Sequence, residues 1–188
     1  DIGVIRNTIK IPTVITETKN EVAYVRIAYF NETTVREFDK AVKKIMAEAP
    51  KGIILDLRSN PGGYLLSAVD VASEWVKSGP IVKEKMRGGE EKTYSSTGGH
   101  RLADIKTVVL VDKGSASASE IVAGALQDYK SATIIGEKTF GKGSVQDFEP
   151  LKDGSALKLT VAKWVTPNGR VIEGQGIEPD VALEEMYL

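Results

Sequence analysis

Cysteine is absent from this 188-residue chain. That absence excludes disulfide bonds, thiolate metal sites and a cysteine nucleophile. Histidine occurs once, as His100, in a polar stretch rich in glycine and serine. A serine–histidine–aspartate triad or a histidine-ligated metal would have to use that one side chain, and we interpret it as solvated. We therefore expect neither a metal ion nor a cofactor.

A strong net charge and a long apolar run are also missing. The formal charge is −1, so no bulk field attracts nucleic acid or an anionic membrane surface. No apolar stretch reaches the ~18 residues that a membrane-spanning helix needs. Hydrophobic residues make up 41% and charged residues 27%, which is typical of one globular domain. The chain starts at Asp1 without methionine, so we interpret it as a piece of a longer protein.

Strand and helix patterns alternate along the chain, which predicts an α/β domain with mostly parallel pairing in its middle. A capping box at Thr34 and Glu37 predicts that a helix starts there. Two more helices are expected over residues 64–77 and 117–129. Strands are expected over 22–29, 52–57, 81–86, 92–95, 107–111, 132–136, 145–148 and 157–165. The sequence Pro167-Asn168-Gly169 predicts a hairpin turn near the C-terminus.

Two strand ends have compositions that suit an active site. The strand ending at Asp56 runs into Gly62 and Gly63 and then into a helix. Paired glycines let backbone N–H groups approach an anion closely, although a tight turn with positive φ explains them equally well. Ser117 stands among small residues where a substrate backbone can reach it. However, Ser117 and Glu120 also form an ordinary capping box, so a helix cap is the alternative.

A third segment, residues 136–144, places Lys142 between Gly141 and Gly143. It resembles a phosphate-binding loop, but Gly143 stands where that loop needs serine or threonine, so we reject nucleotide binding. The glycines can instead bend the lysine inward, where burial favours loss of its proton. The strand after Gly143 would put Lys142, Ser144 and Gln146 on one face. Gln146 can then hold the lysine amine by a hydrogen bond.

Five segments in one order resemble the carboxyl-terminal processing peptidases, the family of tail-specific proteases. They are Asp56-Leu-Arg-Ser-Asn-Pro-Gly-Gly63, Gly114-Ser-Ala-Ser-Ala-Ser-Glu-Ile121, Gly124-Ala-Leu-Gln-Asp128, the run from Gly136 to Gln146 and Gly176-Ile-Glu-Pro-Asp-Val181. The resemblance implies a β-β-α superhelix of the ClpP and crotonase type with a C-terminal β-hairpin. It implies Ser117 as nucleophile, Lys142 as general base and Gln146 as the residue that orients the lysine.

The same resemblance implies an oxyanion hole formed by the N–H groups of Gly63 and Ala118. It also connects Asp128 with activity, but we expect a structural role there, such as an ion pair or a cap. Members of the family carry a PDZ domain before the core. Here residues 1–11 resemble only its last strand, and residues 12–188 are expected to form the protease core.

The leading hypothesis is a serine endopeptidase that cleaves proteins near their C-termini through an acyl-enzyme intermediate. Its expected partners are unstructured protein or peptide substrates, with oligomerisation left open. The resemblance implies an exported protein of the bacterial cell envelope, periplasm or thylakoid lumen. The alternative is a catalytically silent module of the same fold that binds ligands or serves in assembly.

Overall fold

Two sheets organise the protein in this computed structural model, which describes residues 12–183. The larger sheet has the strand order β1-β2-β3-β6-β7-β10, and the smaller has the order β5-β4-β9-β8. The first seven strands are β1 (Val14–Lys19), β2 (Val22–Ile27), β3 (Gly52–Asp56), β4 (Pro80–Met86), β5 (Glu91–Ser95), β6 (Thr107–Val111) and β7 (Thr133–Gly136). The last three are β8 (Ser144–Pro150), β9 (Ala156–Val165) and β10 (Val181–Ala182).

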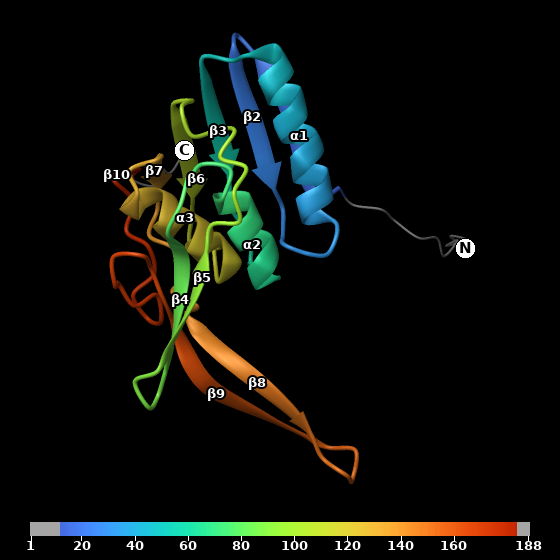
Figure 1. Cartoon of the computed structure of the whole chain (residues 1–188), viewed down its shortest axis with the longest axis vertical. Helices are drawn as coiled ribbons and strands as arrows, with labels where there is room; N and C mark the ends of the chain where they lie inside the picture. The colour runs from blue at the N-terminus through green and yellow to red at the C-terminus, as the bar shows by residue number, and fades with distance from the viewer. Residues whose placement is uncertain (1–11, 184–188) are drawn as a thin grey trace, which may run out of the picture.

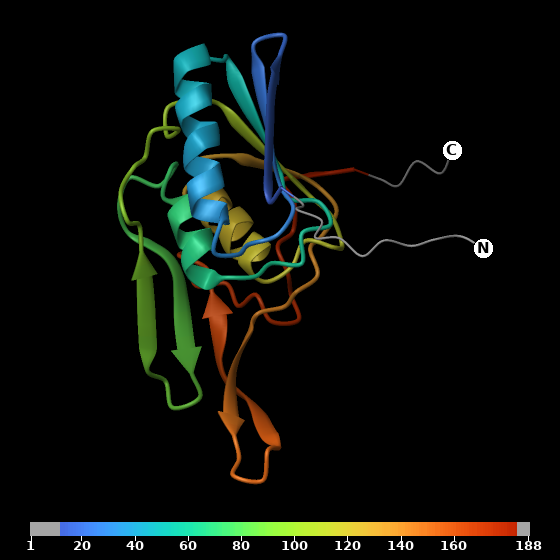
Figure 2. The same ribbon diagram turned by 90° about the vertical axis from the view of Figure 1, so that its right-hand side faces the viewer.

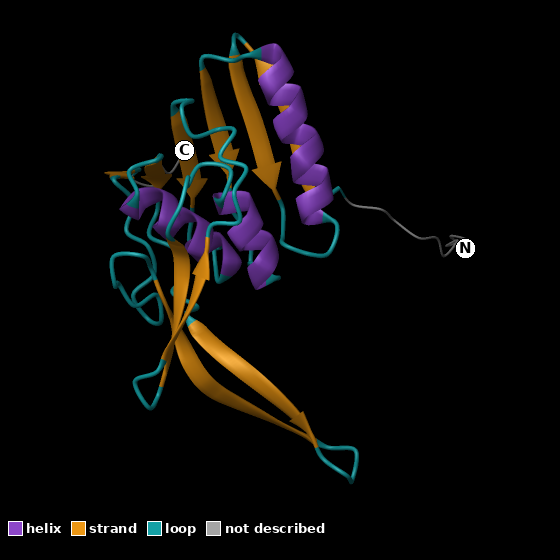
Figure 3. Ribbon diagram, viewed as in Figure 1, coloured by secondary structure: helices purple, strands orange, loops and turns teal. Residues whose placement is uncertain are grey.

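Three helices lie on one face of the larger sheet (Figures 1 and 3). They are α1 (Thr34–Glu48), α2 (Leu65–Ala72) and α3 (Ala118–Asp128). The parallel strands β2, β3, β6 and β7 align Val25, Leu55, Val109 and Ile134 in one row across the sheet. Each of these side chains is at most 1% exposed. Burial of an aliphatic side chain stabilises the fold by ~1.5–3 kcal/mol, so this row anchors the loops at the strand ends.

The smaller sheet extends away from the helices. Its strands β8 and β9 form a long antiparallel hairpin whose far end projects from the rest of the protein (Figures 1 and 2). The base of the hairpin is attached where β9 pairs with β4, from Lys83 opposite Val165 to Met86 opposite Ala162. Residue 142, just before β8, therefore stands where the hairpin joins the body.

The α/β class, the parallel middle and the C-terminal hairpin were all predicted from the sequence and are confirmed. The turn at Pro167–Gly169 is also confirmed, because it closes an antiparallel bridge between Val165 and Val171. The expected strand remnant in residues 1–11 lies outside the described residues. Within residues 12–183, no helix is long and apolar enough to cross a membrane.

Two local predictions were wrong, and the strands β1 and β10 were missed. The helix α2 ends at Ala72 instead of continuing to residue 77. The capping box at Thr34 does not form, because Asn31 Oδ1 accepts the N–H group of Thr34 at 3.1 Å. The Glu37 carboxylate turns to β1 instead and accepts the Thr13 N–H group at 3.1 Å and the Thr13 hydroxyl at 2.5 Å.

Candidate active site

Ser117 has a strained backbone at the start of α3. Its φ is 53° and its ψ is −112°, a region that non-glycine residues occupy at a cost of about 1–3 kcal/mol. Ser117 and Glu120 form the predicted capping box, in which the Ser117 side chain faces the backbone N–H group of Glu120. In the return direction Ser117 N–H donates to Glu120 Oε2 at 2.7 Å. The capping prediction is therefore confirmed, and because a hydroxyl oxygen that accepts a capping bond still carries its own proton, the cap does not exclude a chemical role for Ser117.

Glu120 joins two segments: the serine loop, which contains Ser117 at the start of α3, and the lysine loop, which contains Lys142 just before β8. Its side chain is fully buried, and its Oε2 accepts the N–H groups of Ser117 at 2.7 Å and Lys142 at 2.9 Å. Its Oε1 accepts the Thr139 hydroxyl and the Gly141 N–H group, both at 2.6 Å. One carboxylate oxygen thus holds both amides, so the main chains of Ser117 and Lys142 lie side by side. Sequence reasoning identified Glu120 only as a helix cap and missed this bridge.

The lysine loop is fixed through its backbone and free at its side chain. The Gly143 N–H group donates to Glu173 Oε2 at 2.8 Å, and the Gly143 carbonyl accepts Trp164 N–H at 2.7 Å. The Lys142 side chain is exposed, so the expected inward bend is absent. Gln146 is exposed on β8 as well. Within residues 12–183, no hydrogen bond joins the side chains of Lys142, Gln146 and Ser117.

The glycine turn, formed by Gly62 and Gly63, lies directly against Ser117. A Cβ atom added to Gly62 would stand 2.7 Å from Ser117 Cβ and 2.9 Å from Ala118 N, so only glycine permits this approach. Gly63 has a φ of 137°, and an added Cβ would meet the Phe30 carbonyl oxygen at 1.9 Å. Within the described part of the chain, the N–H groups of Gly63 and Ala118 have no acceptor. These are two backbone donors that remain without a partner in the glycine turn and at the start of α3.

The glycine turn is held in place by Asn60, which sequence reasoning also missed. The Asn60 side chain is fully buried. Its Oδ1 accepts Gly62 N–H at 2.9 Å, and its amide nitrogen donates to the Ile27 carbonyl at 2.7 Å. Its backbone carbonyl accepts the N–H group of Ala116 and the hydroxyl of Ser119, both at 3.0 Å. The glycine turn and the serine loop are therefore parts of one hydrogen-bonded unit.

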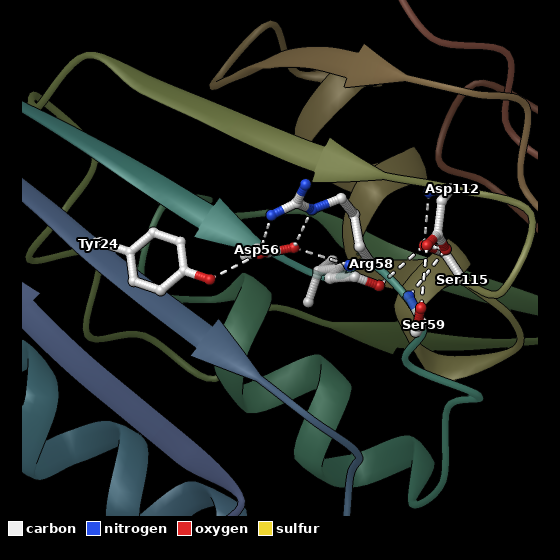
Figure 4. Close-up of polar contacts among 7 residues, drawn as sticks. Tyr24, Asp56, Arg58, Ser59, Asp112 and Ser115 are labelled. Carbon is white, nitrogen blue, oxygen red and sulfur yellow. Dashed lines mark hydrogen bonds and ion pairs between the residues drawn. The ribbon is translucent and has the colours of Figure 1, made fainter. Parts of the chain in front are cut away.

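A polar network supports the same two loops from the strand ends (Figure 4). The Asp112 carboxylate accepts the N–H groups of Ser59 at 2.8 Å and Gly114 at 2.9 Å. The Ser115 hydroxyl donates to the Leu57 carbonyl at 2.8 Å. Since β3 and β6 pair in parallel, these bonds connect the loop after β3 to the loop after β6.

At the other side of Figure 4, the buried Asp56 carboxylate binds the Arg58 guanidinium at 2.9 Å and 2.7 Å and the Tyr24 hydroxyl at 2.7 Å. Burial would raise the pKa of Asp56, but the hydrogen bonds from Arg58 and Tyr24 outweigh it and hold that pKa below its usual value. Burial and the bond to Asp56 raise the pKa of Tyr24. Asp56 is therefore a structural anion at the base of the glycine turn.

The two remaining sequence candidates lie apart from this site. Asp128 pairs with Arg170 at 2.5 Å and accepts Asn168 N–H at 2.8 Å, which is the structural ion pair that we expected. His100 is exposed, as expected for a solvated side chain. Within residues 12–183, no group of three or more histidine, aspartate or glutamate side chains is arranged to hold a metal ion.

Known proteins are similar to this chain in sequence and in fold. The carboxy-terminal-processing protease of Bartonella bacilliformis is 43% identical over 190 residues, which cover 98% of this chain and 44% of that protein. The carboxy-terminal processing protease CtpB of Bacillus subtilis is 42% identical over 167 residues, covering 88% of this chain and 35% of that protein. The solved photosystem II D1 C-terminal processing protease superposes with a TM-score of 0.88 at 36% identity, covering 94% of this chain and 49% of that one.

This chain spans less than half the length of each of these relatives. Its residues 21–183 match the sequence profile of peptidase family S41. That match includes the serine loop, the glycine turn, the lysine loop and Glu120, which joins two of them. The chain therefore belongs to peptidase family S41.

Proposed function

We propose that this chain is the catalytic core of a serine endopeptidase that cleaves proteins near their C-termini. The observation that carries the proposal is the buried Glu120 carboxylate, which holds the backbones of Ser117 and Lys142 together. The two free N–H groups of Gly63 and Ala118 beside Ser117 support it. The names of the relatives support the reaction and the cleavage near the C-terminus.

In the proposed mechanism, Ser117 Oγ attacks the carbonyl carbon of the scissile peptide bond and passes its proton to Lys142 Nζ. The negative charge that develops on the carbonyl oxygen accepts hydrogen bonds from Gly63 and Ala118 N–H. The C–N bond then breaks, and the amine leaves with the proton that Lys142 returns. Lys142 next takes a proton from water, and the resulting hydroxide attacks the carbonyl carbon of the Ser117 ester. The bond between that carbon and Ser117 Oγ breaks, the acid product leaves, and Lys142 returns its proton to Ser117 Oγ.

The exposed Lys142 side chain fits this mechanism because hydrogen bonds between catalytic groups often form only when substrate is bound. Its long flexible side chain can turn toward Ser117 from a backbone that is already in place. We assign Gln146 the role of orienting the lysine amine by a hydrogen bond. An amide suits this role because a carboxylate there would stabilise the ammonium and oppose its loss of a proton.

The partners in this proposal are unstructured proteins or peptides, which the protein recognises at their C-terminal segments. The proposed location is outside the cytoplasm, in the bacterial cell envelope or the thylakoid lumen. The second candidate, a silent binding module, is weaker. A binding module has no need for a serine in a strained backbone conformation whose N–H group is bridged to that of Lys142 by one buried carboxylate.

Mass spectrometry of the products from an unstructured protein tests the proposal. The native chain should produce defined internal cuts, and Ser117→Ala should produce none. Ser115→Ala is the matched control, because the Ser115 hydroxyl bonds to the Leu57 carbonyl and should affect stability more than the cut pattern. Equal cutting by the native chain and Ser117→Ala would refute the nucleophile, and no cutting by the native chain would favour the binding module.

A further inference from the structure

A second segment, residues 172–176, packs against both glycines that flank Lys142. A Cβ atom added to Gly143 would stand 2.2 Å from the backbone nitrogen of Glu173, so only glycine lets the two stretches of chain approach this closely. The Gly141 carbonyl accepts an N–H group of the same segment at 2.9 Å. We call residues 172–176 the brace, because they contact the lysine loop both before and after the lysine.

The direction in which the Lys142 side chain leaves the backbone depends on the two peptide groups beside it. Each group is planar, and only the dihedral angles at Lys142 join them. The group before Lys142 is bound at both ends, by Glu120 and by the brace. The group after it is held through Gly143 N–H, which donates to Glu173 Oε2 at 2.8 Å. Within residues 12–183, that second peptide group forms no other hydrogen bond.

The bond from Glu173 is therefore the main restraint on this peptide group. Gly143 has no side chain that would limit its rotation. Glu173 itself is placed by the fold, because Ile172 beside it is 1% exposed and donates its N–H group to the Trp164 carbonyl at 3.0 Å. The Glu173 carboxylate thus reaches the lysine loop from a segment that is anchored in the core.

We infer that Glu173 is a positioning residue for the general base. Its carboxylate fixes the peptide group between Lys142 and Gly143, and so sets the direction from which the lysine side chain turns to Ser117. The inference rests on the proposed function, which assigns Lys142 as the base. Glu173 acts as a hydrogen-bond acceptor and not as a counter-ion, because within the described residues no ion pair joins it to the Lys142 ammonium. A counter-ion would also favour the protonated lysine and oppose its action as a base.

Two variants of nearly the same shape separate hydrogen bonding from charge. Glu173→Gln keeps an acceptor oxygen at the same reach and removes the charge. Glu173→Asp keeps the charge, but its side chain is one methylene shorter and no longer reaches Gly143 N–H. Hydrogen exchange of the Gly143 amide, followed by NMR, should stay slow in the native protein and in Glu173→Gln and become about tenfold faster in Glu173→Asp. Glu178→Asp is the matched control, because Glu178 is exposed and pairs only with Lys138 at the surface.

Cleavage of an unstructured peptide measures the consequence for the reaction. Glu173→Asp should lower kcat about tenfold at unchanged KM, which corresponds to ~1.4 kcal/mol, because substrate binds as before and the base is misplaced. Glu173→Gln should keep the native kcat and leave the acid limb of the pH–rate profile in place. Native kcat in Glu173→Asp would overturn the inference. So would an acid limb that moves to lower pH in Glu173→Gln, because it would show that the Glu173 charge raises the pKa of Lys142.

The two measurements also separate this inference from the proposed function. If the native protein cleaves no peptide, but Gly143 exchange is slow in Glu173→Gln and fast in Glu173→Asp, the endopeptidase fails and the brace stands. If the native protein cleaves the peptide and both variants exchange and cleave as it does, the endopeptidase stands and the positioning role fails.

Discussion

Replacing Glu120 by glutamine should lower both the stability of the protein and its rate of peptide cleavage. The carboxylate accepts four hydrogen bonds, two at each oxygen, and is fully buried. A glutamine amide has one oxygen and one NH₂ group. With the NH₂ group in the Oε2 position, the N–H groups of Ser117 and Lys142 would face a donor; in the Oε1 position the Gly141 N–H group would, while the Thr139 hydroxyl can turn to accept. An unsatisfied buried donor costs about 1–3 kcal/mol, so with at least one such donor Glu120→Gln should destabilise the protein by about 2 kcal/mol.

For a chain of this size that loss lowers the melting temperature by roughly 4–8 °C. Turnover should also fall at temperatures where the variant is still folded, through kcat more than KM, because Ser117 and Lys142 would no longer be held together. Thermal unfolding by circular dichroism and peptide cleavage at low temperature measure the two effects. Glu149→Gln, on the exposed face of β8, is the matched control. A Glu120→Gln protein with native stability and native kcat would refute the bridging role.

Three further predictions concern the lysine, the glycine turn and the buried aspartate. Lys142→Arg should lose peptide cleavage and keep its melting temperature, because the side chain is exposed and a guanidinium stays protonated; appreciable turnover would contradict a lysine base. Gly62→Ala should lower kcat about 10²-fold or more, because the added Cβ would stand 2.7 Å from Ser117 Cβ; unchanged kcat would contradict the oxyanion hole. Asp56→Asn should be less stable at neutral pH, and its stability should depend less on pH under acid conditions. The pKa of Asp56 is lowered on folding, so its contribution is present above ~4, the usual pKa of aspartate, and is lost as the pH falls through the folded value. Urea unfolding at several pH values checks this, and parallel pH curves for both proteins would contradict it.

The sequence was sufficient for the fold class and for the segments of the site, because each segment combines a buried strand with glycine or small residues at its end. It was not sufficient for the contacts between those segments. Glu120 fits a capping box by local spacing, and only the fold brings Lys142 N–H to the same oxygen. By sequence alone Asn60 is an ordinary turn residue. Its bonds to the Ile27 carbonyl and the Ser119 hydroxyl depend on how the fold packs β2 and α3 around it.

The failed capping box has the same origin. The helix α1 begins at Thr34 as predicted, but the Glu37 carboxylate that would complete the box is bound to Thr13, the residue before β1. The side-chain position of Lys142 could not be predicted from the neighbouring residues either. Its flanking glycines permit an inward bend, but the backbone bonds to Glu120 and Glu173 leave the ammonium in solvent.

The most direct test of the central claim is labelling with a serine-reactive phosphonate, followed by peptide mass spectrometry. The account predicts one covalent adduct on Ser117, formed by the native chain and lost in Lys142→Arg, whose side chain cannot accept the serine proton. Ser115 and Ser119 should remain unlabelled, because their hydroxyls are buried and bonded to backbone carbonyls. An adduct on another serine, or equal labelling of Ser117 in Lys142→Arg, would contradict the serine–lysine mechanism.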